Sequence, residues 1–131
     1  MEKYKDKDPS CYYYWAYAKI HSNQWDQVSH DFTVDKISSD DILRLARLCE
    51  SLKKYTHANF FYKKKLTNST LDGEILNNIA WNYHLDENYV LALTYAEKAY
   101  TSSPFDKNIL HTYSSILIKN KDYSKVVSLI E

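Results

Sequence analysis

The chain has 131 residues, a formal net charge of zero and 44% hydrophobic residues, so it can form a core but carries no overall basic field to attract nucleic acid or anionic membranes. It contains thirteen tyrosines but only one glycine, Gly73. A single glycine excludes P-loops, dinucleotide-binding turns and nucleophile elbows, which each need two or more, and it disfavours sheet-rich folds; the composition therefore indicates a mostly helical protein.

The two cysteines, Cys11 and Cys49, are far apart and form no C-x-x-C pair, so the usual spacing of a structural zinc site is missing. Isolated thiols are typical of a reducing compartment. The first ten residues are charged without a following apolar stretch, and no apolar run has the length of a membrane span. We therefore expect a cytoplasmic protein without metal or cofactor; the alternative is an extracytoplasmic form matured from a precursor.

The chain repeats itself at a displacement of 34 residues. Tyr55, Tyr89 and Tyr123 are the same residue at that spacing. Apolar positions match as well, in the triples Ile42/Leu76/Leu110, Leu45/Ile79/Tyr113, Ala46/Ala80/Ser114 and Ala58/Ala92/Val126. Self-similarity at a fixed period of this length indicates a repeat architecture.

The first two units are the less regular ones. Residues 9–38 form a degenerate unit, in which Asp8 is expected to cap a helix that begins at Pro9. The remaining markers of this unit are Tyr12, Trp15, Ala16 and Lys19 on a first helix, then Trp25 and Val28 on a second. Residues 39–72 form the next unit, with Lys65 where a small residue is expected.

Residues 73–106 are the most regular unit, and residues 107–131 repeat it until the chain stops within a second helix. Two stripes at helical spacing predict a helix pair. They consist of Leu76, Ile79, Ala80 and Tyr83, followed by Tyr89, Ala92, Ala96 and Ala99. Asp72 and Asp106 stand where N-caps are needed, and Ser103-Pro104 is expected to end the second helix.

These residues resemble the tetratricopeptide repeat (TPR), a helix-turn-helix unit with the same period. The order large, large, small, aromatic on the first helix, then three small residues and a proline, is supplied here by Leu76, Ile79, Ala80, Tyr83, Ala92, Ala96, Ala99 and Pro104. The resemblance implies an all-α, right-handed helix-turn-helix repeat solenoid with about three to four helix pairs, forming a single domain over residues 1–131.

The resemblance also implies that first helices line a concave groove that binds a peptide segment of a partner protein. The positions carried over from the family are Arg44, Arg47, Asn77, Asn78, Trp81, His84, Asn108, His111, Thr112 and Ser115. Arg can bind a carboxylate through two hydrogen bonds, Asn can pair with a peptide backbone, and Trp81 offers a flat apolar anchor. The alternative is a polar surface with one exposed tryptophan.

The last predicted helix, from about Tyr123 to Glu131, has apolar residues and no following unit to cover them. These residues are Val126, Val127, Leu129 and Ile130. We expect this edge to contact a second copy, giving a homodimer, or another protein. The alternative is that the short helix folds back and hides those side chains.

Two further patterns, the spacing of the histidines and an aromatic run near the N-terminus, could be taken for a catalytic or nucleic-acid-binding site. His30, His57, His84 and His111 recur every 27 residues, which is not the structural period, so we expect no histidine column. The aromatic run at residues 12–17 lacks the interleaved basic residues of a single-stranded nucleic-acid site and is expected to be mostly packing. The leading prediction is a non-catalytic adaptor or scaffold. The alternatives are a secretion-type TPR chaperone, or a catalytic or nucleic-acid-binding domain that uses His, Lys and aromatic residues.

Overall fold

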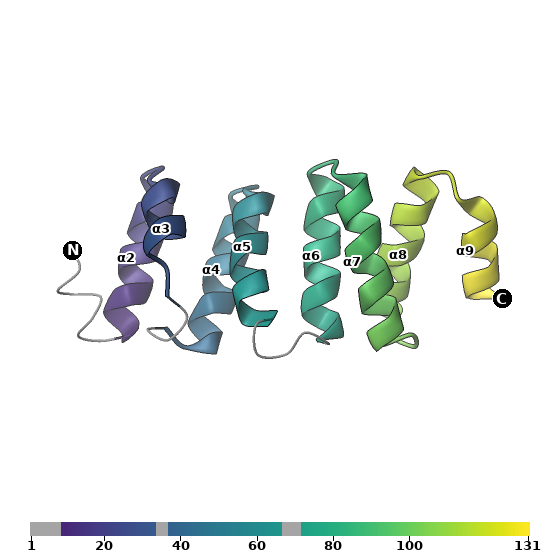
Figure 1. Cartoon of the computed structure of the whole chain (residues 1–131), viewed down its shortest axis with the longest axis horizontal. Coiled ribbons are helices and arrows are strands. Elements are labelled where there is room, and N and C mark those ends of the chain that lie inside the picture. Colours follow the sequence, from purple (N-terminus) through teal and green to yellow (C-terminus); the bar gives the residue numbers. More distant parts are fainter. Residues whose placement is uncertain (1–8, 34–36, 67–71) are drawn as a thin grey trace. The chain divides into compact units, whose positions relative to one another are not determined.

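The computed structural model describes residues 9–33, 37–66 and 72–131, and within these ranges the secondary structure is helical, with no strand (Figure 1). The chain divides into two compact units, Met1–Lys65 and Leu66–Glu131. The prediction of an all-α fold is confirmed. None of the helices found in these ranges is both long and apolar enough to cross a membrane.

Unit 1 contains two helix pairs. The first pair is α2 (Pro9–His21) and α3 (Trp25–Asp31), and the second is α4 (Ser39–Ser51) and α5 (Tyr55–Leu66). Helix α2 begins at Pro9 as predicted, whereas its expected cap, Asp8, lies outside the described residues. At α4 the Ser38 side chain accepts a hydrogen bond from the Asp41 amide at 3.2 Å, which satisfies a first-turn donor.

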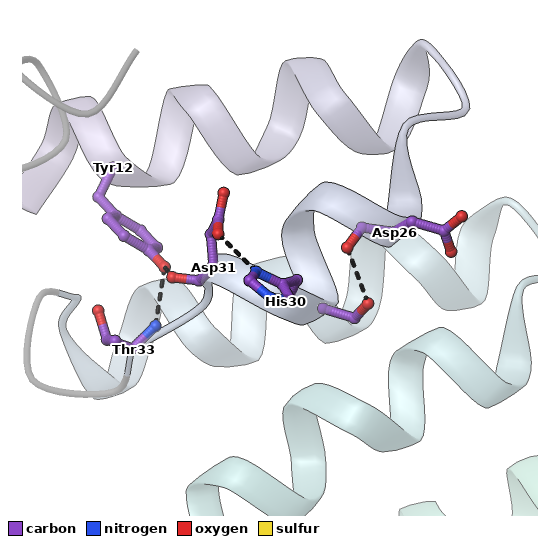
Figure 2. Close-up of polar contacts among 6 residues, drawn as sticks. Tyr12, Asp26, His30, Asp31 and Thr33 are labelled. Carbon is purple, nitrogen blue, oxygen red and sulfur yellow. Dashed lines mark hydrogen bonds and ion pairs between the residues drawn. The ribbon is translucent and has the colours of Figure 1, made fainter.

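Aromatic side chains hold the helices of unit 1 together. Tyr12 of α2 is fully buried, and its hydroxyl joins the end of α3 twice (Figure 2): it donates to the Asp31 carbonyl at 3.1 Å and accepts from the Thr33 amide at 2.8 Å. Between α3 and α5, the Trp25 ring meets the edge of Phe61 at a centroid distance of 5.6 Å. Much of the chain's unusual aromatic content therefore lies in packing contacts.

Unit 2 contains α6 (Gly73–Leu85), α7 (Tyr89–Ser102), α8 (Lys107–Lys119) and α9 (Tyr123–Ile130). Asp72 and Asp106 are N-caps as predicted: the Asp72 carboxylate accepts from the Ile75 amide at 3.1 Å, and Asp106 accepts from Asn108 at 2.8 Å and Ile109 at 3.2 Å. The predicted stripes on α6 and α7 are buried apart from the half-buried Tyr89, and the two helices pack against each other. Helix α8 packs against both α6 and α7, and α9 packs against α8.

The turn inside each helix pair has the same backbone form. One residue in each turn adopts a left-handed conformation: Asn23, Lys53, Glu87 and Lys121, with φ between 59° and 62°. The amide of the following residue then donates to a carbonyl five residues back, as Asn88 does to Tyr83 at 2.9 Å and Asp122 to Leu117 at 2.9 Å. This is the Schellman ending of a helix, made here without glycine. Lys53, Glu87 and Lys121 are 34 residues apart, so the period seen in the sequence is also present in the backbone.

Gly73, the single glycine, begins α6 at a point of close approach. A Cβ at this position would lie 2.7 Å from Ser103 Oγ and 3.2 Å from Ile109 Cδ1. Because both neighbours belong to the α7–α8 connection and to α8, the missing side chain at residue 73 is what lets α8 lie close to α6.

Candidate functional site

Four of the predicted groove residues, three on α6 and one on α8, lie near one another in unit 2. Asn77, Trp81 and His84 follow one another on α6 at spacings of four and three, which places them on one face of the helix. The Trp81 ring centroid lies 5.0 Å from that of His84 and 6.1 Å from that of His111 on α8. An indole therefore lies beside two imidazoles where α6 and α8 run next to each other.

This face has hydrogen-bonding groups without partners. Asn77 Oδ1 and His84 Nδ1 are buried atoms, and neither has a hydrogen-bond partner among the described residues. Burial lowers the pKa of the His84 imidazole, and the charge of Lys119 lowers it further, so the ring is neutral at pH 7 and can donate or accept. A buried polar atom left unpaired is costly. Both atoms are closed to solvent, so a ligand on this face would meet the accessible remainder of these half-buried side chains.

The remaining predicted positions of unit 2 differ in exposure. Asn108 is exposed, and Asn78 and Ser115 are half-buried. Thr112 is only 5% exposed, because it lies among the buried residues of α8 between Ile109 and Tyr113. The prediction that Thr112 lines an open surface is therefore corrected: its side chain belongs to the packing of α8.

The two predicted arginines belong to unit 1. Arg44 donates to the Asp41 carboxylate at 2.9 Å, and its guanidinium lies 4.3 Å from the centre of the Tyr13 ring. Arg44 thus joins α4 to α2 through a cation–π contact. Arg47, one turn later, is exposed. Because the two arginines belong to unit 1, the candidate site is the α6–α8 face of unit 2. We define this face by Asn77, Trp81, His84 and His111.

The apolar residues of α9 are only partly covered. Val126 and Leu129 are half-buried, whereas Val127 is 54% and Ile130 64% exposed. The alternative in which α9 folds back and hides its apolar side chains is therefore wrong for Val127 and Ile130.

One close aromatic contact of unit 1 is not indicated by the sequence pattern. The His57 ring stacks on Trp25, with centroids 4.0 Å apart and planes 10° from parallel. The two residues are 32 positions apart and belong to different helix pairs of unit 1, so neither helical spacing nor the 34-residue period indicates the contact. In the aromatic run, Tyr12, Tyr13 and Trp15 are buried, and Tyr14 and Tyr17 are exposed, in agreement with a mostly packing role.

The Cys49 thiol is buried and protonated. Burial raises the pKa of the Cys49 thiol to about 12, with Lys54 opposing and Glu50 adding to the shift, so this thiol stays protonated at neutral pH. Cys49 is fully buried and belongs to the core of unit 1. Within the part of the chain that the structure describes, no three residues of the His, Cys, Asp and Glu types are grouped to hold a metal ion.

No protein-family model matches the chain, and no curated protein matches it significantly in sequence. The resemblance to the TPR family therefore rests on the residues and spacings quoted above.

Proposed function

We propose that this chain is a non-catalytic interaction module built of TPR-like helix pairs in a right-handed solenoid, and that it binds a polypeptide segment of a partner protein. Three observations support the repeat arrangement. The left-handed turn residues Lys53, Glu87 and Lys121 share the 34-residue period of the sequence. Within unit 2, α6 and α8 run in the same direction and pack on each other, as first helices of successive repeats do (Figure 1).

The proposed binding function rests on the α6–α8 face of unit 2. Trp81 supplies an apolar ring beside His84 and His111, and Asn77 Oδ1 and His84 Nδ1 are buried with no partner among the described residues. An extended segment can lay an apolar side chain against the half-buried indole while its amides and carbonyls meet the exposed imidazole of His111. The module would then act by holding and presenting its partner. The unpaired cysteines, Cys11 and Cys49, favour a reducing cytoplasmic setting.

The proposal is tested by selecting peptides from a random display library on the whole chain and measuring their affinities by calorimetry. We expect Trp81→Ala and His111→Ala each to weaken the selected peptides about tenfold or more, because aromatic anchors dominate such interfaces. The matched control is Phe105→Ala, which removes a 97% exposed ring from the loop between α7 and α8 in the same unit.

Circular dichroism of each variant shows whether weaker peptide binding reflects a missing contact or an unfolded protein. Selected peptides that bind all three variants as well as the unaltered chain would contradict the proposal, as would a selection that yields no peptide above background.

A further inference from the structure

Helix α2 of unit 1 carries a row of exposed rings. Tyr14, Tyr17 and His21 are three and four residues apart, which places them on one face of the helix at successive turns. Tyr14 is 64% and Tyr17 40% exposed, and His21 is exposed as well. The ring centroids of Tyr17 and His21 are 4.6 Å apart. Three planar groups are therefore open to solvent along about 10 Å of one helix.

Helix α4 brings two arginines to this row. Within unit 1, α2 and α4 run in the same direction and pack against each other (Figure 1). The buried Tyr13 ring lies 4.3 Å from the guanidinium carbon of Arg44. The same ring lies 5.3 Å from the Tyr14 ring and 6.1 Å from the Tyr17 ring, measured between centroids. Arg47 follows Arg44 by one turn and is exposed. The basic residues that are missing between the rings in the sequence are thus supplied by the neighbouring helix.

The charges beside the row favour an anionic ligand. Helix α2, from Pro9 to His21, contains no acidic residue. Arg44 donates to Asp41, but the Arg44 side chain is 55% exposed and the Asp41 side chain 18%, so the cation faces solvent more than its partner does. Arg47 forms neither a hydrogen bond nor an ion pair with any residue that the structure describes.

The zero net charge of the chain conceals a difference between its halves. Unit 1 contains twelve of the seventeen Lys and Arg residues and nine of the seventeen Asp and Glu residues, whereas unit 2 contains five and eight. The formal charge is therefore +3 for unit 1 and −3 for unit 2. Such an asymmetry is typical of chains in which one part meets a polyanion.

We propose that unit 1 binds single-stranded nucleic acid on its α2–α4 face, which we define by Tyr14, Tyr17, His21, Arg44 and Arg47. Sites of this kind combine aromatic side chains, on which bases stack, with basic side chains that contact the phosphates. In unit 1 the rings belong to α2 and the cations to α4. Unpaired bases are required, because the bases of a duplex are already stacked on one another. This activity is separate from the peptide binding proposed for unit 2.

An acidic polypeptide is the other ligand with a complementary charge. Its carboxylates would pair with Arg44 and Arg47 but would leave the exposed rings of Tyr14 and Tyr17 without a planar partner. A nucleotide uses both kinds of side chain, since its base stacks on a ring and its phosphate meets a guanidinium. The combination of rings and arginines therefore favours nucleic acid.

The probe is a fluorescently labelled oligothymidine of about 12 nucleotides, whose anisotropy is followed as the whole chain is added at low salt. We expect Tyr14→Ala and Tyr17→Ala each to weaken binding about fivefold or more, because each removes a stacking surface. Tyr14→Phe and Tyr17→Phe keep the ring and should keep the affinity. The matched control is Tyr123→Ala, which removes a 58% exposed ring from α9 of unit 2 and should leave the affinity unchanged.

The salt dependence tests the arginines independently of the rings. Arg47→Gln should weaken binding and reduce the slope of log affinity against log salt concentration by about 0.7 for the phosphate contact that is lost. Lys63→Gln removes the same charge from an exposed position on α5 of unit 1 and should leave that slope unchanged. Circular dichroism of each variant establishes that the helices are retained.

Four results would overturn the proposal. They are an absence of oligothymidine binding at low salt, unaltered affinity in both alanine variants, equal affinity for a duplex of the same length, and an Arg47→Gln slope equal to that of the unaltered chain. Displacement of the oligonucleotide by polyglutamate at an equal concentration of charge would also overturn it, since an acidic polypeptide would then be the ligand. None of these outcomes depends on Trp81 or His111, so they are distinct from the test of the α6–α8 face.

Discussion

The His57 ring lies flat on the indole of Trp25, and its imidazole is half-buried there. Burial lowers the pKa of His57; Lys54 lowers it further and Asp26 raises it. The Nδ1 atom is buried, with no hydrogen-bond partner in the described ranges. The neutral ring is therefore the form that the folded state of unit 1 favours.

We expect unit 1 to lose stability as the pH falls. A histidine whose pKa is lower in the folded state contributes its full share to the free energy of unfolding above its unfolded pKa, about 6.5. That share decreases as the pH falls from there toward the folded pKa. Urea unfolding of the whole chain followed at pH 7.5 and pH 5 should show this loss. His57→Phe keeps a stacking ring without a titratable group and should reduce the difference between the two pH values. An NMR titration that gives His57 a pKa above 6.5 would contradict the expectation.

The left-handed turn residues offer a stabilising substitution. A residue with a side chain at φ near 60° is strained by about 1–2 kcal/mol, and glycine is not. Part of this stabilisation is offset because glycine raises the conformational entropy of the unfolded chain. Lys121, at φ 62°, is exposed. We expect Lys121→Gly to stabilise the protein by about 0.5–1 kcal/mol in urea unfolding. Its neighbour Asn120 has φ −83°, so Asn120→Gly is the control and should destabilise.

The Tyr12 hydroxyl connects α2 to the end of α3, and its loss should be measurable. Tyr12→Phe leaves the Asp31 carbonyl and the Thr33 amide without this partner, and we expect a loss of about 1–2 kcal/mol in the free energy of unfolding. Tyr14→Phe, two residues away at an exposed ring, should have no effect. Equal stability of the two variants would show that the hydroxyl contributes nothing.

The two thiols should react at very different rates. Cys11 is exposed, whereas Cys49 is buried with a pKa raised to about 12. Ellman's reagent at pH 8 should therefore modify Cys11 of the folded chain rapidly and Cys49 only as α4 becomes accessible. Cys11→Ser isolates the slow reaction, which should become fast in urea. Rapid modification of both thiols in the folded chain would contradict the buried position of Cys49.

Much of the helical layout could be predicted from the sequence. Tyr55, Tyr89 and Tyr123 each begin a second helix of a pair, and the N-caps Asp72 and Asp106 stand where their chemistry indicated. These features are local: a cap bonds within one turn, and a helical stripe repeats over a few residues.

Features that depend on packing were harder to predict. Nothing in the residue types of Lys53, Glu87 and Lys121 indicates a left-handed backbone, because packing of the two flanking helices imposes it. Thr112 was expected on an open surface, yet it lies among the buried residues of α8. The Trp25–His57 stack joins residues of two helix pairs, and no short-range pattern specifies such a contact.

Each unit contains one tryptophan beside a histidine, Trp25 with His57 in unit 1 and Trp81 with His84 in unit 2. A protonated imidazole quenches the emission of a neighbouring indole, and the pKa values of both histidines are lowered by burial. We therefore expect the fluorescence of each pair to fall on acidification. A variant that keeps Trp25 as its single tryptophan would give a fluorescence signal from unit 1. A variant that keeps Trp81 alone would give one from unit 2.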